Sequence, residues 1–130
     1  MMTLTVKEPW ASLIAAGTKR IENRTWETKY RGPLAIHAGK SPASPSALEW
    51  LEDNGIVVPS LVYGKIVAVV NLIDCVELDD LPGDLVDDVF AEGPWCWILA
   101  DARLVTPPIA AKGKLGLWRF DGKIEVAAQK

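Results

Sequence analysis

The sequence predicts an α+β protein, built as a small, closed or half-closed mixed β-barrel with two short helices. Five or six strand-like segments are visible along the chain, and only two helical segments accompany them. Because the helices do not alternate with the strands, a barrel is favoured over a doubly wound parallel sheet. A chain of 130 residues supports one core, so we expect a single domain over residues 1–130.

The N-terminal part of the chain predicts a strand, a two-turn helix and a second strand. A short apolar strand precedes Pro9, which suits a first helical position, and Gly17 is a helix stop. The segment KRIENRTW then alternates in character. In an extended chain Glu22, Arg24 and Trp26 share one face. We therefore expect a strand with one charged face.

The segment RGPLAIHAG predicts the next strand, which we expect to pair with the charged strand. Its aliphatic residues at 34, 36 and 38 point one way, and His37 points the other way. A helix is predicted in SPASPSALEWLEDNG, beginning either at Ser44 with Pro45 or at a capping box of Ser46 and Glu49. It ends at Gly55, and Leu48 and Leu51 are its predicted core positions.

The remaining segments are mainly strands. The β-branched run GKIVAVVNLIDCVEL predicts a central strand buried on both faces for most of its length. An acidic connection with one helical turn follows, and PWCWILADARLV returns to strand. The last strand, GLWRFDGKIEV, is predicted to turn back as a hairpin around Asp121 and Gly122.

Charge is distributed unevenly along this acidic chain, whose net charge is −3. Residues 1–40 carry seven Lys or Arg against three Asp or Glu, residues 41–110 carry two against twelve, and residues 111–130 carry five against two. The excesses of +4, −10 and +3 sum to −3. If the two ends of the chain lie side by side, they form a basic face on an acidic body, which suits an anionic ligand such as phosphate or nucleic acid.

Several classes of protein and site are disfavoured. The longest apolar run, IVAVV, is too short to cross a bilayer, and the N-terminus lacks a secretory signal, so we expect a soluble, cytoplasmic protein. Cys75 and Cys96 lie in strand-like runs and predict buried thiols. One histidine and two distant cysteines do not form a zinc site, and no phosphate-cradling glycine-rich loop is present. We expect no metal and no cofactor.

The candidate site lies in the basic strand pair. Lys19 and Glu22 bracket the junction between helix and strand, Arg24 shares a face with Glu22, and His37 comes from the expected next strand. A partly desolvated lysine beside a carboxylate can act as a proton donor, a base or a fixed positive charge, and arginine grips phosphate or carboxylate with a planar fork. The alternative is a surface ion-pair ladder of little energetic value.

Aromatic residues favour the first of these interpretations. The chain has six tryptophans, and Trp10, Trp26 and Trp118 lie within or beside the basic segments, where an indole face can stack on a base. The other three, at positions 50, 95 and 97, are expected to serve the core.

Several motifs together carry a resemblance to a known family. They are LTVKEPWASLIAAGTKRIENRTWETKYRGPLAIHAG, GKIVAVV, GPWCWIL and KGKLGLWRF, in this order. With these motifs the chain resembles an ASCH domain, the activating-signal-cointegrator homology family, over nearly its whole length. The resemblance implies a β-barrel related to the RNA-binding PUA fold. It also implies a cleft beside the barrel, where the helix carrying Trp10 meets the segment from Lys19 to Arg24.

The same resemblance implies RNA-related or coactivator roles, and some small family members are hydrolases. One is an amidohydrolase of acetylated cytidine, whose catalytic lysine matches Lys19 and whose following arginine matches Arg24. Where that enzyme has its catalytic threonine, this chain has Glu22. Glutamate cannot replace a hydroxyl nucleophile without changing the intermediate to an anhydride, so deacetylation is not assigned.

Three functional interpretations follow. In the first, a basic cleft binds RNA or a single modified nucleotide, with Lys19, Arg24 and Lys114 on phosphate, a tryptophan on the base and Glu22 on a base edge. In the second, the chain is a hydrolase of an acylated nucleoside or of RNA, with Glu22 as general base, Lys19 as electrostatic stabiliser or acid and His37 as proton carrier. In the third, the acidic middle segment docks a basic protein partner.

Overall fold

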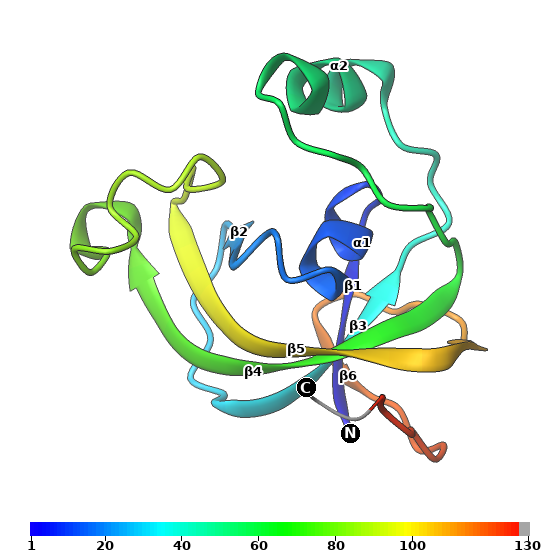
Figure 1. Cartoon of the computed structure of the whole chain (residues 1–130). Coiled ribbons are helices and arrows are strands. Elements are labelled where there is room, and N and C mark those ends of the chain that lie inside the picture. The colour runs from blue at the N-terminus through cyan, green and yellow to red at the C-terminus, as the bar shows by residue number, and fades with distance from the viewer. Residues whose placement is uncertain (128–130) are drawn as a thin grey trace.

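Six strands form one curled sheet in the computed structural model, which describes residues 1–127 (Figure 1). The strand order is β2-β5-β4-β3-β1-β6. The strands are β1 (Met2–Val6), β2 (Ile21–Arg24), β3 (Gly32–Ala38), β4 (Lys65–Glu77), β5 (Trp95–Ala110) and β6 (Leu117–Arg119). Two α-helices accompany them, α1 (Trp10–Ala15) and α2 (Pro45–Asp53), with a 3₁₀ turn at Leu78–Asp80 in the acidic connection.

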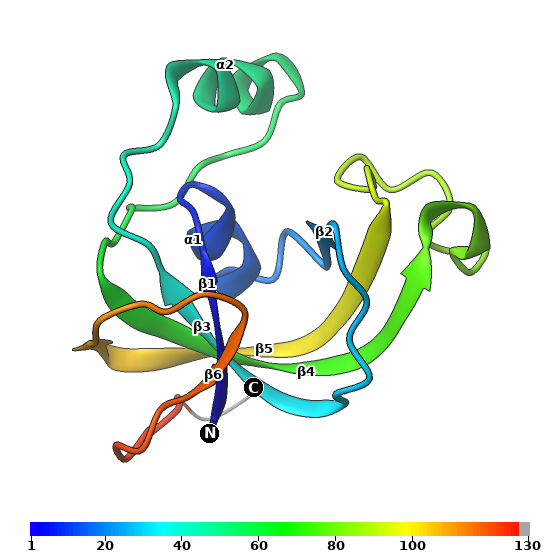
Figure 2. The same cartoon turned by 180° about the vertical axis from the view of Figure 1, so that it is seen from behind.

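The sheet is mixed and bends into a half-barrel. Strands β1 and β3 are parallel, and every other pair of neighbours is antiparallel. The long strands β4 and β5 shift register three times along their shared length, and such bulges bend the strands that carry them. Figures 1 and 2 show both strands curving around the helix α1. The predicted α+β class and the half-closed mixed barrel are confirmed.

The core follows the predicted apolar pattern. Leu34, Ile36 and Ala38 of β3 point into the main cluster beneath α1, and Ala35 points into a second cluster on the opposite face of the sheet. Strand β4 contributes to both clusters from the run Ile66–Val70, as expected for a central strand. Helix α1 is short but well anchored, because the buried Glu8 carboxylate accepts hydrogen bonds from the Ser12 backbone and hydroxyl.

Helix α2 stands apart from the sheet (Figure 1). Of the two predicted starts it uses the first, with Ser44 as the N-cap, since the Ser44 hydroxyl accepts a hydrogen bond from the Ala47 amide at 3.1 Å. Leu51 is its one buried residue and packs with Leu13 of α1 and with Phe90. Leu48 is only half-buried, contrary to its predicted core position. The helix is therefore joined to the body through a small apolar cluster.

Two expectations about strand pairing are wrong. Strand β2 pairs with β5, whereas β3 lies between β4 and β1, so the two basic segments do not form a strand pair. The C-terminal hairpin around Asp121 and Gly122 is also not found: β6 pairs with β1, and Val126 instead forms an isolated bridge to Val105. Both errors have the same cause: the alternation of side chains predicts that a segment is a strand, but not which other strand it pairs with. Within residues 1–127, neither α-helix has the length and apolar character to cross a bilayer.

Candidate functional site

A cleft of about 870 Å³ opens between β2, the two helices and the loop that follows β5. This volume lies within the roughly 300–1,000 Å³ typical of pockets that hold small ligands. Its charged side chains are five cations and two carboxylates, and its aromatic side chains are three tryptophans and a phenylalanine. They are Lys7, Lys19, Arg24, Lys40, Lys114, Glu22, Glu92, Trp10, Trp26, Trp50 and Phe90.

The floor of the cleft holds a buried ion pair. Lys19 is 5% exposed and Glu22 is 7% exposed, and the Lys19 ammonium donates to Glu22 Oε1 at 3.1 Å and to the Ile21 carbonyl. The same ammonium lies 5.8 Å from the centre of the Phe90 ring. These contacts hold a desolvated lysine with its charge compensated, as a buried ammonium requires.

Arg24 extends this pair into a three-residue network. Its Nε and Nη2 atoms lie 3.0 and 2.8 Å from Glu22 Oε2, and Nη2 also donates to the Thr5 carbonyl at 2.9 Å. Glu22 and Arg24 lie two residues apart on one strand, so they share a face, as the alternation predicted. The network carries two positive charges and one negative charge. It therefore presents a net positive charge at the bottom of the cleft.

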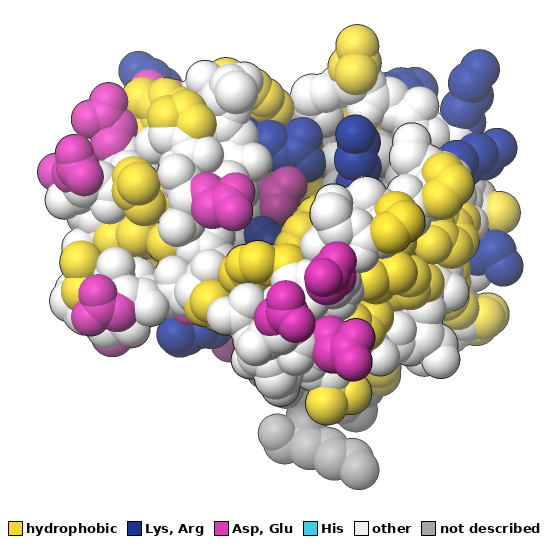
Figure 3. Space-filling model, turned by 90° about the horizontal axis from the view of Figure 1, so that it is seen from above, with side chains coloured by type: hydrophobic (Ala, Val, Ile, Leu, Met, Phe, Trp, Pro, Cys, Tyr) yellow, Lys and Arg dark blue, Asp and Glu magenta, His cyan; other side chains and the backbone are white. Residues whose placement is uncertain are grey.

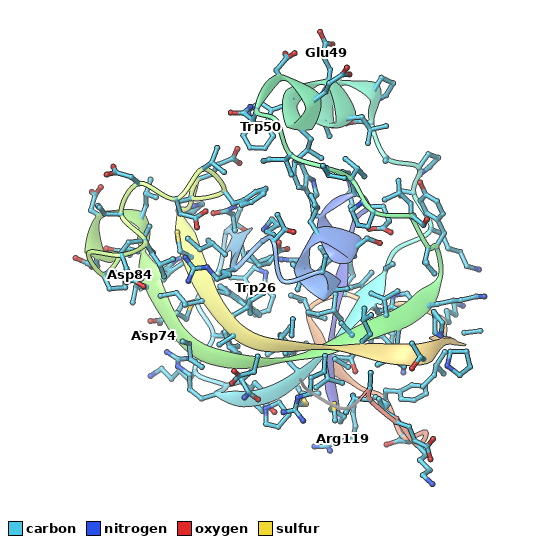
Figure 4. The ribbon with its side chains drawn as sticks, in the orientation of Figure 1. Trp26, Glu49, Trp50, Asp74, Asp84 and Arg119 are labelled. Carbon is cyan, nitrogen blue, oxygen red and sulfur yellow. The ribbon has the colours of Figure 1, made fainter. Side chains whose placement is uncertain are left out.

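Aromatic rings form one wall. Trp10 packs edge to face with Trp50 and with Phe90, at centroid distances of 6.1 and 6.4 Å. Trp50 points from α2 toward the body of the protein, whereas the neighbouring Glu49 points away from it (Figure 4). The expectation that Trp50 serves the core holds in part: it packs against the core cluster of Leu13, Leu51 and Phe90, and it also lines the cleft. The Trp50 ring meets the cleft beside Trp10 of α1 and Phe90, and both of these residues are far from Trp50 in the sequence.

Trp26 lies on the β2 side of the cleft (Figure 4). Its ring stands edge to face against the fully buried Trp97, at a centroid distance of 4.8 Å, and its carbonyl accepts a hydrogen bond from Trp97 Nε1. Trp97 thus belongs to the core as expected and supports Trp26 from behind. The indole of Trp26 is held in place while it remains half-buried.

His37 and Trp118 lie outside the set of residues that line the cleft. His37 is 1% exposed; its Nε2 donates to the Ala111 carbonyl at 2.7 Å, and its Nδ1 accepts from the Thr5 hydroxyl at 3.2 Å. The indole Nε1 of Trp118 donates to the same hydroxyl at 3.1 Å. His37 projects from the face of β3 opposite to its aliphatic residues, which point toward α1. The structure therefore brings Lys19, Glu22 and Arg24 together without His37.

Three exposed lysines form a basic rim around the cleft: Lys7 after β1, Lys40 after β3, and Lys114 in the loop between β5 and β6. Lys7 and Lys40 were not singled out from the sequence, although both contribute to the basic excess of residues 1–40. The basic excess of residues 1–40 is the sequence feature that points to them, but it does not show which lysines come together at the cleft. The Lys114 ammonium lies 5.8 Å from the centre of the Trp118 ring.

The surface charge is divided in space as it is along the chain. Seen from above, Lys and Arg side chains gather toward the upper right of the molecule, and acidic side chains lie on the left and over α2 (Figure 3). The termini contribute to one region because β1 and β6 are neighbours, with Met2 opposite Arg119. The juxtaposition of the two ends that a basic face requires is thus present.

Comparisons with known proteins identify related sequences. A family model described as the ASCH domain matches residues 4–109. The chain is 29% identical over 136 aligned residues to Activating signal cointegrator 1 of Homo sapiens, and equally to the protein of that name from Mus musculus. Each match covers 98% of this chain and 23% of the relative. The chain therefore spans less than a quarter of the length of these curated relatives.

Proposed function

We propose, from the premise that this chain belongs to the ASCH domain family, that its cleft binds RNA or a single, modified nucleotide or nucleoside. The family is associated with RNA binding. In this proposal the phosphate groups lie against the lysine rim and Arg24, and a base stacks on a tryptophan of the cleft. We also propose a cytoplasmic location, since Cys75 and Cys96 are free thiols and the cytosol keeps thiols reduced.

The observation that carries this proposal is the charge of the cleft compared with the charge of the whole chain. Five cations against two carboxylates line the cleft, an excess of three positive charges, on a protein whose net charge is −3. A concave positive surface with low-dielectric walls concentrates anions. Because aromatic rings line the same cleft, the ligand that fits combines negative charge with a flat ring, as a nucleotide does.

The floor network gives this ligand a fixed electrostatic partner. Glu22 has one cation on each carboxylate oxygen, so in this proposal its main role is to orient Lys19 and Arg24. Nη1 of Arg24 makes none of the hydrogen bonds that hold the guanidinium, and Arg24 lines the cleft. An arginine held in this way meets a phosphate with little loss of side-chain entropy.

The test is a salt titration of binding to single-stranded RNA, followed by tryptophan fluorescence. The variant is Lys7→Gln/Lys40→Gln/Lys114→Gln, which removes three exposed charges without touching the core. The control is Lys123→Gln, in the segment after β6 at the far end of the molecule from α2 (Figure 1). We expect the triple variant to bind more weakly, with a slope of log K against log salt that is shallower by about 0.7 for each lost phosphate contact.

A wild-type protein that shows no salt-dependent binding at low ionic strength contradicts the polymer form of the proposal. Equal slopes for the triple variant and the Lys123 control contradict the assignment of the cleft. Mononucleotides and modified nucleosides are titrated in parallel, because saturation by these ligands without RNA binding favours the single-nucleotide form.

A second candidate function, a hydrolase of an acylated nucleoside or of RNA, is favoured by one observation. Lys19 and Glu22 are both buried, in contact with each other and part of the cleft floor. Such a pair can place a positive charge next to a carboxylate at a reacting bond. Wild type, Lys19→Met and Glu22→Gln are compared for turnover of acylated nucleosides and short RNAs. Turnover that is lost in both folded variants supports this function, and equal turnover by all three proteins removes it.

A further inference from the structure

The loop between β5 and β6 places a fully exposed apolar side chain beside the cleft. Leu115 is 99% exposed, more than any other large hydrophobic side chain among residues 1–127, and it stands at the mouth of the cleft. Lys112 and Lys114 precede it, and both are exposed. Single exposed leucines are common on protein surfaces, so the position of Leu115 matters more than its exposure: it lines the cleft and directly follows an exposed lysine that also lines it.

The base of this loop is held firmly. His37 Nε2 donates to the Ala111 carbonyl at 2.7 Å, where the loop begins. Gly113 passes so close to the sheet that an added Cβ would lie 3.0 Å from both His37 Cε1 and Thr5 Oγ1. At the other end Trp118 is buried and bonded to Thr5. The tip is therefore presented on a supported base, and this lowers the entropy cost of inserting Leu115 into a partner.

We propose that Leu115 is a wedge that enters the base stack of a folded or double-stranded nucleic acid, while one base leaves the stack and enters the cleft. This inference rests on the proposed nucleic-acid function of the cleft and names its substrate class. Apolar side chains that insert between base steps unstack them, and neighbouring cations hold the flanking phosphates. Lys112 and Lys114, which precede Leu115 in the loop, are the cations that hold the flanking phosphates in this proposal.

The cleft beside the wedge has the properties that an extruded base requires. Its volume of about 870 Å³ is enough for one nucleotide whose base has left the stack. Trp26 and the wall of Trp10 and Trp50 offer aromatic faces, and enzymes that take up a flipped base also stack it between such side chains. Wedge and pocket lie side by side, because Leu115 itself lines the cleft.

The experiment uses the whole chain and two probes of the same sequence, an RNA hairpin and a DNA duplex, each with 2-aminopurine at a mismatched stem position. Extrusion of this base relieves its stacking and raises its fluorescence. The variants are Leu115→Ala and Leu115→Met. The control is Val57→Ala, which removes an apolar side chain that is 86% exposed and does not line the cleft.

We expect fluorescence to rise on binding of wild type, the Val57 control and Leu115→Met. Leu115→Ala should still bind with the same salt slope, but without the fluorescence rise and with an affinity about tenfold lower, the scale of burying a leucine side chain. The two probes distinguish a folded RNA from a DNA duplex as the source of the stacked bases.

Two results overturn the inference. One is binding by wild type that raises the fluorescence of neither probe, and the other is a Leu115→Ala protein with an unchanged rise. Absence of binding to every nucleic acid and nucleotide tested is a different outcome, since it contradicts the proposed function of the cleft itself.

Discussion

The guanidinium of Arg24 donates a hydrogen bond to the backbone carbonyl of Thr5 at 2.9 Å, and so joins β2 to β1 across the open side of the half-barrel. Strands β5, β4 and β3 lie between these two strands in the sheet. Because the same guanidinium also binds Glu22, one side chain links the opening of the barrel to the floor of the cleft.

Arg24→Lys tests this link. Lysine keeps the charge but cannot reach Glu22 and Thr5 with a planar fork, so we expect the free energy of unfolding to fall by about 1–3 kcal/mol. Urea denaturation measures the loss. The matched control is Arg20→Lys, because Arg20 is exposed and its nearest carboxylate, on Asp88, is 3.9 Å away. A fall of the same size in both variants contradicts the special role of Arg24.

Glu22→Gln tests the buried pair. The change leaves the Lys19 ammonium buried without its compensating carboxylate, which costs about 3–5 kcal/mol of stability. The double variant Lys19→Met/Glu22→Gln contains no unpaired ammonium, so its destabilisation should be smaller than the sum of the two single effects. A double-mutant cycle from urea denaturation measures this coupling, and additive effects refute it.

Leu51→Ala tests the attachment of α2. Leu51 is fully buried against Leu13 and Phe90, and its truncation removes the one buried side chain of this helix. We expect a loss of about 2–5 kcal/mol in the packing of α2. Hydrogen exchange should accelerate at residues 45–53 while the amides of β4 stay protected. Equal acceleration in β4 would show that α2 unfolds only with the whole protein.

The two cysteines should be unreactive in the folded protein. Burial is the main cause that raises the pKa of both the Cys75 and the Cys96 thiol. Each thiol therefore stays protonated at neutral pH, and thiolate reagents should label them slowly until urea is added. Their register excludes a disulfide, since Cys96 lies opposite Val76, whose side chain points to the other face from Cys75.

The same pKa shifts have a consequence for stability at alkaline pH. A raised pKa in the folded state means that the unfolded chain loses its thiol protons first. The contribution of the two thiols to the free energy of unfolding is therefore fully present below the pKa that they have in the unfolded chain. It is lost as the pH rises through the pKa that they have in the folded protein. Replacing both cysteines by alanine should flatten the alkaline limb of a stability profile measured by urea denaturation. An unchanged alkaline limb would contradict this.

Sequence patterns predicted the features that depend only on interactions between neighbouring residues. The cap at Ser44 and the stop before Gly55 predicted α2, because capping involves only neighbouring residues. Strand alternation correctly put Glu22 and Arg24 on one face. It also put His37 on the face of its strand opposite to the aliphatic residues.

The set of side chains that meet at the cleft could not be predicted from local patterns. Alternation gives the face of a residue but not what covers that face, so it could not say that the loop at Ala111 closes over His37. Trp50 packs against the core as its segment predicts, but nothing in that segment indicates that Trp10 and Phe90 also meet it at the cleft. Lys7 and Lys40 are separated by an entire helix and two strands.

The amino-acid sequence by itself determined the class of fold, the faces of the strands, and the basic character of both ends of the chain. These properties depend on dihedral preference and side-chain spacing over a few residues. Only the tertiary structure decided that β2 pairs with β5, that β6 returns beside β1, and which cations and rings share one cleft. Those outcomes depend on packing between segments far apart in the chain, and such packing is resolved only when the whole sheet closes around α1.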